Sequence, residues 1–123
     1  QVFIYEGDND ISSGKTRDEI LEDTKMVLDK IWSSDPETEI VLISPKPSVA
    51  RWNLKEQYLA LNTALSDLAE DHENLRFADV WHPALDENGM VMKDIFIQDN
   101  LHMNQKGYAI WETTIKPFLK DCK

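Results

Sequence analysis

The chain has 123 residues, enough for one domain, and its 41% hydrophobic and 29% charged residues exclude intrinsic disorder. No apolar run approaches the ~20 residues that span a bilayer, and a net charge of -10 argues against nucleic-acid and anionic membrane partners. A single cysteine, Cys122, excludes an intrachain disulfide and a cysteine-rich zinc site, and it leaves the compartment open.

The chain opens on the apolar block Val2–Tyr5, which ends before Gly7 and predicts a buried strand followed by a tight turn. No signal peptide precedes this block, and Gln1 is not a methionine. An intact domain rarely begins inside a buried strand. We therefore expect the sequence to start within a domain, as a processed product or a fragment.

Helices and strands alternate through the rest of the chain. Thr16 and Glu19 form the pattern of a capping box, and apolar residues recur at helical spacing until residues 33–36. A second buried strand is predicted over 40–43, a helix over 53–72 and a third strand over 75–80. A long loop follows over 81–103, and a last helix begins near Asn104, which Pro117 should kink or restart.

This order of elements predicts an α/β fold with a parallel sheet, right-handed crossovers and helices packed on the sheet. Three strands are few for such a sheet, whose centre and faces are normally covered. We therefore expect strands that precede the first one to be missing from this sequence.

Open parallel sheets place their sites beyond the carboxyl ends of the strands. Three segments fall there: residues 6–10, 44–47 and 99–102. Asp99 and His102 are three residues apart, so a carboxylate can fix the imidazole tautomer and leave the other nitrogen as a general base. Alternatively, Asp99 caps the last helix and His102 is a surface residue.

The segment Gly7-Asp8-Asn9-Asp10 also has two interpretations. Asn9 could present its amide to a ligand, or the four residues could form only a turn. A third hypothesis is a calcium loop, because Asp8, Asp10, Ser12 and Glu19 match positions 1, 3, 5 and 12 of such loops. Against it, Ser13 and Lys15 occupy the glycine and apolar positions, and a strand precedes the loop.

Together the two end segments resemble the SGNH (GDSL-type) serine hydrolases. The matching blocks are Gly7-Asp8-Asn9-Asp10 and the run 99–108, which reads Asp-Asn-Leu-His-Met-Asn-Gln-Lys-Gly-Tyr. The resemblance covers essentially the whole chain. It implies a three-layer α/β/α, flavodoxin-like parallel sheet, of which residues 1–123 would be the carboxy-terminal part, without the first strands and helices.

The resemblance also implies roles for single residues. Asn9 matches the donor to the oxyanion, His102 the general base and Asp99 the residue that orients it. Gly7 would turn the chain so that Asn9 is exposed, and Asp8 and Asp10 would support the loop. The implied reaction is ester hydrolysis through an acyl-enzyme, acting on a small-molecule, sugar or lipid ester, with no metal or organic cofactor.

One element of the family pattern is missing. The family nucleophile lies in a Gly-Asp-Ser motif on the first strand, and no such motif occurs here. Ser44 ends a predicted strand, but Pro45 follows it and no helix opens there, so Ser44 is interpreted as structural. We therefore expect this chain alone to be inactive and to need the amino-terminal portion of the same domain, which may be another chain.

Two further hypotheses remain open. Trp52 and Trp81 follow the second and third strands and could line a substrate groove, although Trp81 could equally be structural. His82 is an alternative general base, but it is taken to lack a carboxylate at the spacing that separates Asp99 from His102. The alternative to an esterase is a non-catalytic module that binds a partner or carbohydrate, or that self-associates through the open edge of the first strand.

Overall fold

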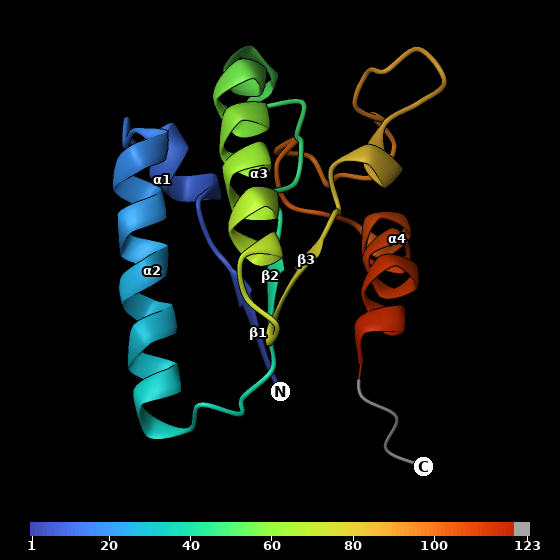
Figure 1. Cartoon of the computed structure of the whole chain (residues 1–123). Coiled ribbons are helices and arrows are strands. Elements are labelled where there is room, and N and C mark those ends of the chain that lie inside the picture. The colour runs from blue at the N-terminus through green and yellow to red at the C-terminus, as the bar shows by residue number, and fades with distance from the viewer. Residues whose placement is uncertain (120–123) are drawn as a thin grey trace.

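The computed structural model describes residues 1–119, so Cys122 lies outside the described part of the chain. Three strands, β1 (Val2–Tyr5), β2 (Ile40–Ile43) and β3 (Leu75–Ala78), form one parallel sheet in the order β1-β2-β3. Figure 1 shows this sheet at the centre, with helices on both sides. The predicted α/β fold and its parallel sheet are confirmed.

The central strand β2 divides the core into two layers because its side chains alternate between the two faces of the sheet. Ile40 and Leu42 pack with residues of α2 (Arg17–Ser34) and α3 (Lys55–Glu70). Val41 and Ile43 pack on the other face, against Trp111 and residues that follow it. That face is covered by α4 (Gln105–Ile115), which completes the predicted three layers (Figure 1).

The ends of the helices follow the local signals in the sequence. The capping box of α2 is present: Glu19 N–H donates to Thr16 Oγ1 at 3.2 Å, and Thr16 N–H donates to Glu19 Oε1 at 3.0 Å. Asn104 caps α4 by accepting from the N–H of Gly107 at 3.1 Å. Pro117 lies in a 3₁₀ turn, η3 (Lys116–Phe118), which restarts the helix as predicted.

The segment after β1 differs from the predicted turn. Gly7 has a φ of 103°, and a five-residue helix, α1 (Asp8–Ser12), follows it directly. A Cβ on Gly7 would lie 2.7 Å from Leu61 Cδ2, so both the backbone angle and the packing require glycine. Gly7 therefore brings Asp8 and Asn9 to the carboxyl edge of the sheet through a sharp turn and a short helix.

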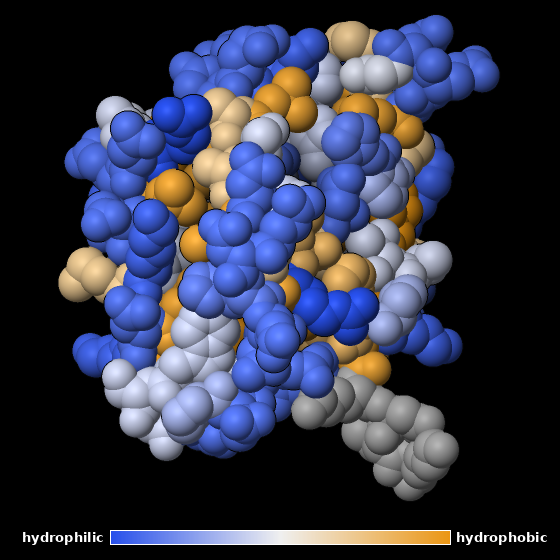
Figure 2. Space-filling view, viewed as in Figure 1, coloured by the Kyte–Doolittle hydropathy of each residue, from blue (hydrophilic) through white to orange (hydrophobic). Residues whose placement is uncertain are grey.

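The free edge of β1 is partly apolar. Among residues 1–119, β1 pairs with β2 alone, and its first three residues are only half-buried while Tyr5 is exposed. Elsewhere, the face over α2 and α3 in Figure 2 is mostly hydrophilic, with apolar atoms emerging between the helices. Within the described residues, no helix combines the length and apolar character that a membrane span requires.

Candidate active site

The loop between β3 and α4 holds Asp99 and His102 in a closed turn. Phe96 and Met103 form a single antiparallel bridge at its base, and Ile97 N–H donates to the carbonyl of His102 at 2.9 Å. Asp99 Oδ1 accepts from the backbone N–H groups of Leu101 and His102, each at 2.9 Å. These two bonds hold the Asp99 carboxylate in the position from which it contacts the imidazole of His102.

The second oxygen of Asp99 lies 2.5 Å from Nδ1 of His102. A carboxylate at this distance keeps the proton on Nδ1 and leaves the lone pair of Nε2 available. The His102 side chain is 70% exposed, so Nε2 can be reached from solvent. The hydrogen bond from His102, with those from the backbone, lowers the pKa of Asp99 to about 2. Asp99 is therefore ionised throughout the range in which an imidazole works as a base.

This lowered pKa predicts how the Asp99–His102 contact responds to acid. The contribution of Asp99 to folding stability should be complete above its ordinary pKa of 3.8 and disappear as the pH falls through about 2. Carboxyl-carbon NMR should give an Asp99 midpoint near the lower value, and His102→Ala should return it towards the ordinary one. A midpoint near 3.8 in the unsubstituted chain would contradict the contact.

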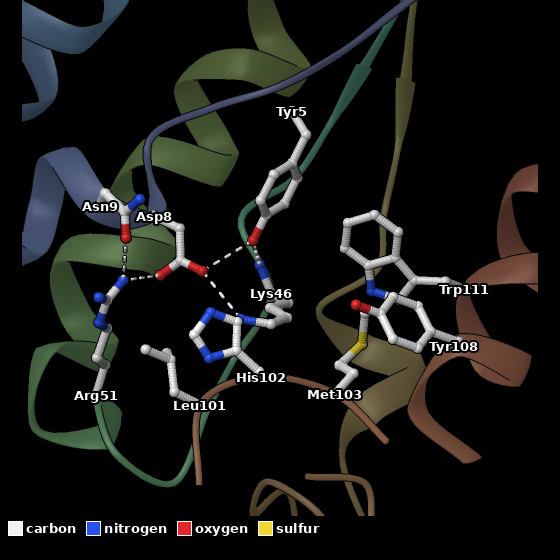
Figure 3. A pocket seen from close by; sticks show the side chains of 10 residues that line it. All are labelled: Tyr5, Asp8, Asn9, Lys46, Arg51, Leu101, His102, Met103, Tyr108 and Trp111. Carbon is white, nitrogen blue, oxygen red and sulfur yellow. Dashed lines mark hydrogen bonds and ion pairs between the residues drawn. The ribbon is translucent and has the colours of Figure 1, made fainter. Parts of the chain in front are cut away.

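Asn9 and His102, which are far apart in the sequence, border the same hollow of about 300 Å³ (Figure 3). Asn9 belongs to α1, and His102 belongs to the loop before α4. The hollow is polar on one side and carbon-rich on the other; the other residues around it are Tyr5, Asp8, Lys46, Arg51, Leu101, Met103, Tyr108 and Trp111. Positions 9 and 102 therefore border one hollow, and Asp99, which does not line it, contacts His102.

Asp8 is the most heavily bonded residue of the site. Its buried carboxylate accepts from Arg51 at 2.7 Å, from Tyr5 at 2.9 Å and from Lys46 at 3.1 Å, as Figure 3 shows, and also from Tyr58. Burial by itself would raise the pKa of Asp8, but the Tyr58 hydrogen bond and the two cations outweigh it and hold this pKa below its usual value. Asp8 therefore links α1, as a carboxylate, to the end of β1, to the loop after β2 and to α3.

Arg51 determines which way the amide of Asn9 faces. Its guanidinium donates to Asn9 Oδ1 at 3.1 Å while a second bond holds it on Asp8. Because a guanidinium has only donors, the amide oxygen must be the atom that faces it, and the NH₂ group is left for other acceptors. Asn9 is thereby fixed as a hydrogen-bond donor at the hollow.

The sequence analysis missed both cations of this cluster. Lys46 lies in the segment 44–47, which was expected at the carboxyl edge of the sheet. Its position was therefore predictable, but nothing in the sequence indicated that it contacts Asp8. Arg51 carried none, because 42 residues separate it from Asn9. Lysine and arginine side chains are rarely buried, and here the carboxylate of Asp8 compensates the charge of both.

The prediction that His82 lacks a matching carboxylate is wrong. Asp79, three residues earlier, lies 2.5 Å from Nδ1 of His82 and accepts from the N–H groups of Trp81 at 2.8 Å and His82 at 3.1 Å. This is the hydrogen-bond pattern of Asp99 and His102. However, His82 borders a different hollow, which contains neither Asn9 nor His102.

For Trp81, burial favours the structural alternative over the substrate groove suggested for Trp52 and Trp81. The two indoles stack on each other with ring centroids 5.8 Å apart, and Trp81 is buried against Tyr58. Neither borders the hollow of Asn9 and His102. Trp81 belongs to the core cluster on the α2 and α3 face of the sheet, and Trp52 is half-buried against it.

The remaining residues of the predicted segments have structural roles. Ser44 is fully buried and accepts from the N–H of Val80 at 2.9 Å, which agrees with its structural interpretation. The carbonyl of Asp10 accepts from Ser13 and Lys15, so Asp10 supports the end of α1. The calcium hypothesis fails because Asp8 faces Lys46 and Arg51, and residues 1–119 contain no acidic or histidine cluster suited to a metal ion.

Residues 1–110 match the GDSL-like Lipase/Acylhydrolase family. No match is found among curated proteins. Among solved structures, the chain is similar to a protein described provisionally as a platelet activating factor from Streptococcus pneumonia, at 24% identity and a TM-score of 0.84. The likeness covers 94% of this chain and 57% of that one.

Two other similar structures are named as hydrolases. A carbohydrate esterase family 3 protein from Talaromyces cellulolyticus is 19% identical, with a TM-score of 0.79, and is matched over 95% of this chain and 56% of its own. A GDSL-like lipase from Bacteroides thetaiotaomicron is 19% identical, with a TM-score of 0.75, over 94% and 60%. These likenesses show the fold, and the chain spans less than two thirds of the length of each.

Proposed function

The chain belongs to the GDSL-like lipase/acylhydrolase family, and from this premise we propose that it supplies the base, the orienting carboxylate and an oxyanion donor for ester hydrolysis. The observation that carries the proposal is the hollow shared by Asn9 and His102, two residues from opposite ends of the chain. Family membership supports a hydrolase in general. The residue roles rest on the geometry described above.

In the proposed reaction, a serine hydroxyl attacks the ester carbonyl and its proton passes to Nε2 of His102. The same proton then goes to the departing alcohol, which leaves an acyl-enzyme. Water hydrolyses this intermediate with His102 again acting as base, and the serine is regenerated. Asp99 stays ionised throughout and stabilises the imidazolium that forms in each half of the reaction.

Asn9 acts on the negative charge that develops on the carbonyl oxygen. Its NH₂ group is free to donate because Arg51 occupies the amide oxygen. A donor that is already oriented needs no rearrangement during the reaction, and losing one such donor costs ~10²–10³-fold in rate in other hydrolases. The cluster around Asp8 is the support that keeps Arg51 and Asn9 in place.

The nucleophilic serine belongs to the amino-terminal portion of the domain in this proposal. Residues 1–119 contain no serine at the hollow, and Ser44 is committed to the backbone of Val80. The free edge of β1 supports a preceding strand at this side of the sheet, where β1 pairs with β2 only. That strand would bring its own loop close to Asn9.

The carbon-rich side of the hollow suits the acyl or alcohol part of a small-molecule, sugar or lipid ester. Leu101, Met103 and Trp111 supply this carbon surface, and Figure 3 shows Met103 and Trp111 on the side away from Asn9. Pockets of this kind bind through apolar walls and use a few polar groups to orient the ligand. The reacting carbonyl would lie between the two sides.

Turnover of a short-chain nitrophenyl ester tests the proposal. Residues 1–123 alone should give no turnover above the rate of the buffer. The same chain joined to a serine-bearing amino-terminal portion, or mixed with it, should hydrolyse the ester. Clear activity of residues 1–123 alone, abolished by His102→Ala, would show that the nucleophile lies within this chain and would overturn that part of the proposal.

A further inference from the structure

A second hollow, of about 260 Å³, lies between α3 and β3, and Asp79 and His82 border it. Figure 1 shows α3 beside β3, the end strand of the described sheet. Asn62 and Ser66 face the hollow from α3, because residues four apart lie on the same side of a helix. None of these residues borders the hollow of Asn9 and His102, so the two hollows are distinct.

Asn62 is the unusual residue of this second hollow. It is 91% buried, since its relative exposure is 9%, and neither its amide nitrogen nor its amide oxygen has a hydrogen-bond partner among the described residues. A buried polar group without a partner is destabilising, so native proteins rarely keep one without a reason. Both atoms are closed to solvent as they stand, so a ligand that offers a donor and an acceptor satisfies them when the Asn62 side chain turns into the hollow.

His82 adds a second hydrogen-bonding atom. Asp79 holds Nδ1 at 2.5 Å, which leaves Nε2 as an acceptor on a side chain that is 71% exposed. Both oxygens of Asp79 are already occupied, by His82 and by two backbone N–H groups. Ser66, next to Asn62 on the helix, contributes a hydroxyl that can donate or accept.

The charges around the hollow select the class of ligand. Within residues 1–119 no lysine or arginine borders it, whereas Asp67 does, so an anion is disfavoured. Among the described residues, no cluster suited to a metal ion is present. A purely apolar ligand would leave the amide of Asn62 without a partner. A neutral ligand with several hydroxyl groups meets all three conditions, and Phe77 offers carbon surface for its C–H face.

We propose that the hollow of Asn62 and His82 binds a neutral polyol, a sugar ring, which pairs hydroxyl groups with the Asn62 amide and with Nε2 of His82. The site is separate from the one proposed for hydrolysis. It would hold a sugar at the β3 edge whether or not the ester is cleaved, so its test needs no turnover.

Titration of the ¹⁵N-labelled chain with methyl glucoside and with xylobiose tests the site by NMR. We expect saturable shifts of the side-chain amide signals of Asn62 and of the backbone signal of Ser66. Asn62→Leu should weaken the affinity about tenfold or more. The same variant should raise the denaturant midpoint of the sugar-free protein, because leucine removes the unpaired polar atoms.

Two control substitutions, Asn74→Leu for Asn62→Leu and His72→Gln for His82→Gln, separate loss of sugar binding from general effects on the fold. Asn74→Leu removes an amide that does donate, to the carbonyl of Pro36 at 3.2 Å, so it should not raise the midpoint and should leave sugar affinity unchanged. His82→Gln, at an exposed position, should weaken binding, whereas His72→Gln, which stacks on Trp32, should not. Asn62 signals that do not move with either sugar would overturn the proposal. So would shifts with a neutral dipeptide alone, or unchanged affinity in both Asn62→Leu and His82→Gln.

Discussion

Replacing His102 by alanine is expected to lower kcat of ester hydrolysis by about 10⁴–10⁶-fold in the protein that carries the serine-bearing portion. The reason is that Nε2 of His102 is the base of the proposed reaction, and no other imidazole borders the hollow of Asn9. The measurement is nitrophenyl ester turnover at saturating substrate. KM should change far less than kcat, because His102 acts on the serine proton rather than on binding.

His82→Ala is the matched control for His102→Ala. His82 has the same carboxylate contact and the same exposure, 71% against 70%, so the two substitutions remove equivalent chemistry from different places. We expect His82→Ala to leave kcat unchanged for the nitrophenyl ester, which carries no sugar. Loss of turnover in His82→Ala with normal turnover in His102→Ala would assign the base to the other pair and contradict the proposed site.

Asp8→Asn is expected to lower the free energy of unfolding by about 3–5 kcal/mol, because it leaves the charges of the buried Lys46 and the partly buried Arg51 without a counter-charge. The side chains of Asp8, Lys46 and Arg51 are 10%, 11% and 17% exposed, so the cations cannot simply turn into water. Denaturant unfolding of the chain measures this loss. Arg51 would also lose its anchor, so the amide of Asn9 should become mobile in NMR relaxation.

Asp23→Asn provides the comparison for the effect of Asp8→Asn. Its ion pair with Lys15 is as short, at 2.6 Å, but the two side chains are 47% and 42% exposed. Exposed pairs contribute about 0–1 kcal/mol, so this change should be small. If Asp8→Asn were as mild as Asp23→Asn, the cluster around Asp8 would not be a buried charge network.

The features that depend on neighbouring residues were predictable from the sequence. The Thr16 capping box, the buried strand β2 and the start of α4 near Asn104 each rest on residue types within a few positions, whereas the cap of α4 is Asn104 and not Asp99, the alternative considered. The contact of Asp99 with His102 belongs to the same class, since a spacing of three residues lets side chains meet. Fold class followed from the alternation of such local elements.

Most of the contacts that were missed depend on tertiary packing. One, between Asp79 and His82, was missed because the three-residue spacing was considered only for Asp99 and His102. Nothing local indicates that Arg51 contacts Asn9 or that Trp52 stacks on Trp81, because the three-dimensional path of the loops decides both. The short helix α1 has too few residues for a periodic pattern. Asp79 and His82 are different, because their spacing was visible in the sequence and equals that of the pair that was recognised.

The hydrogen bonds from Tyr58 to Asp8 tie the candidate active site to the middle of the molecule. Tyr58 is 1% exposed and belongs to the helix whose apolar face covers the sheet. Heating that loosens this helix must therefore release Asp8, Arg51 and Asn9 together. Loss of the candidate site and loss of the fold should then occur in one cooperative transition.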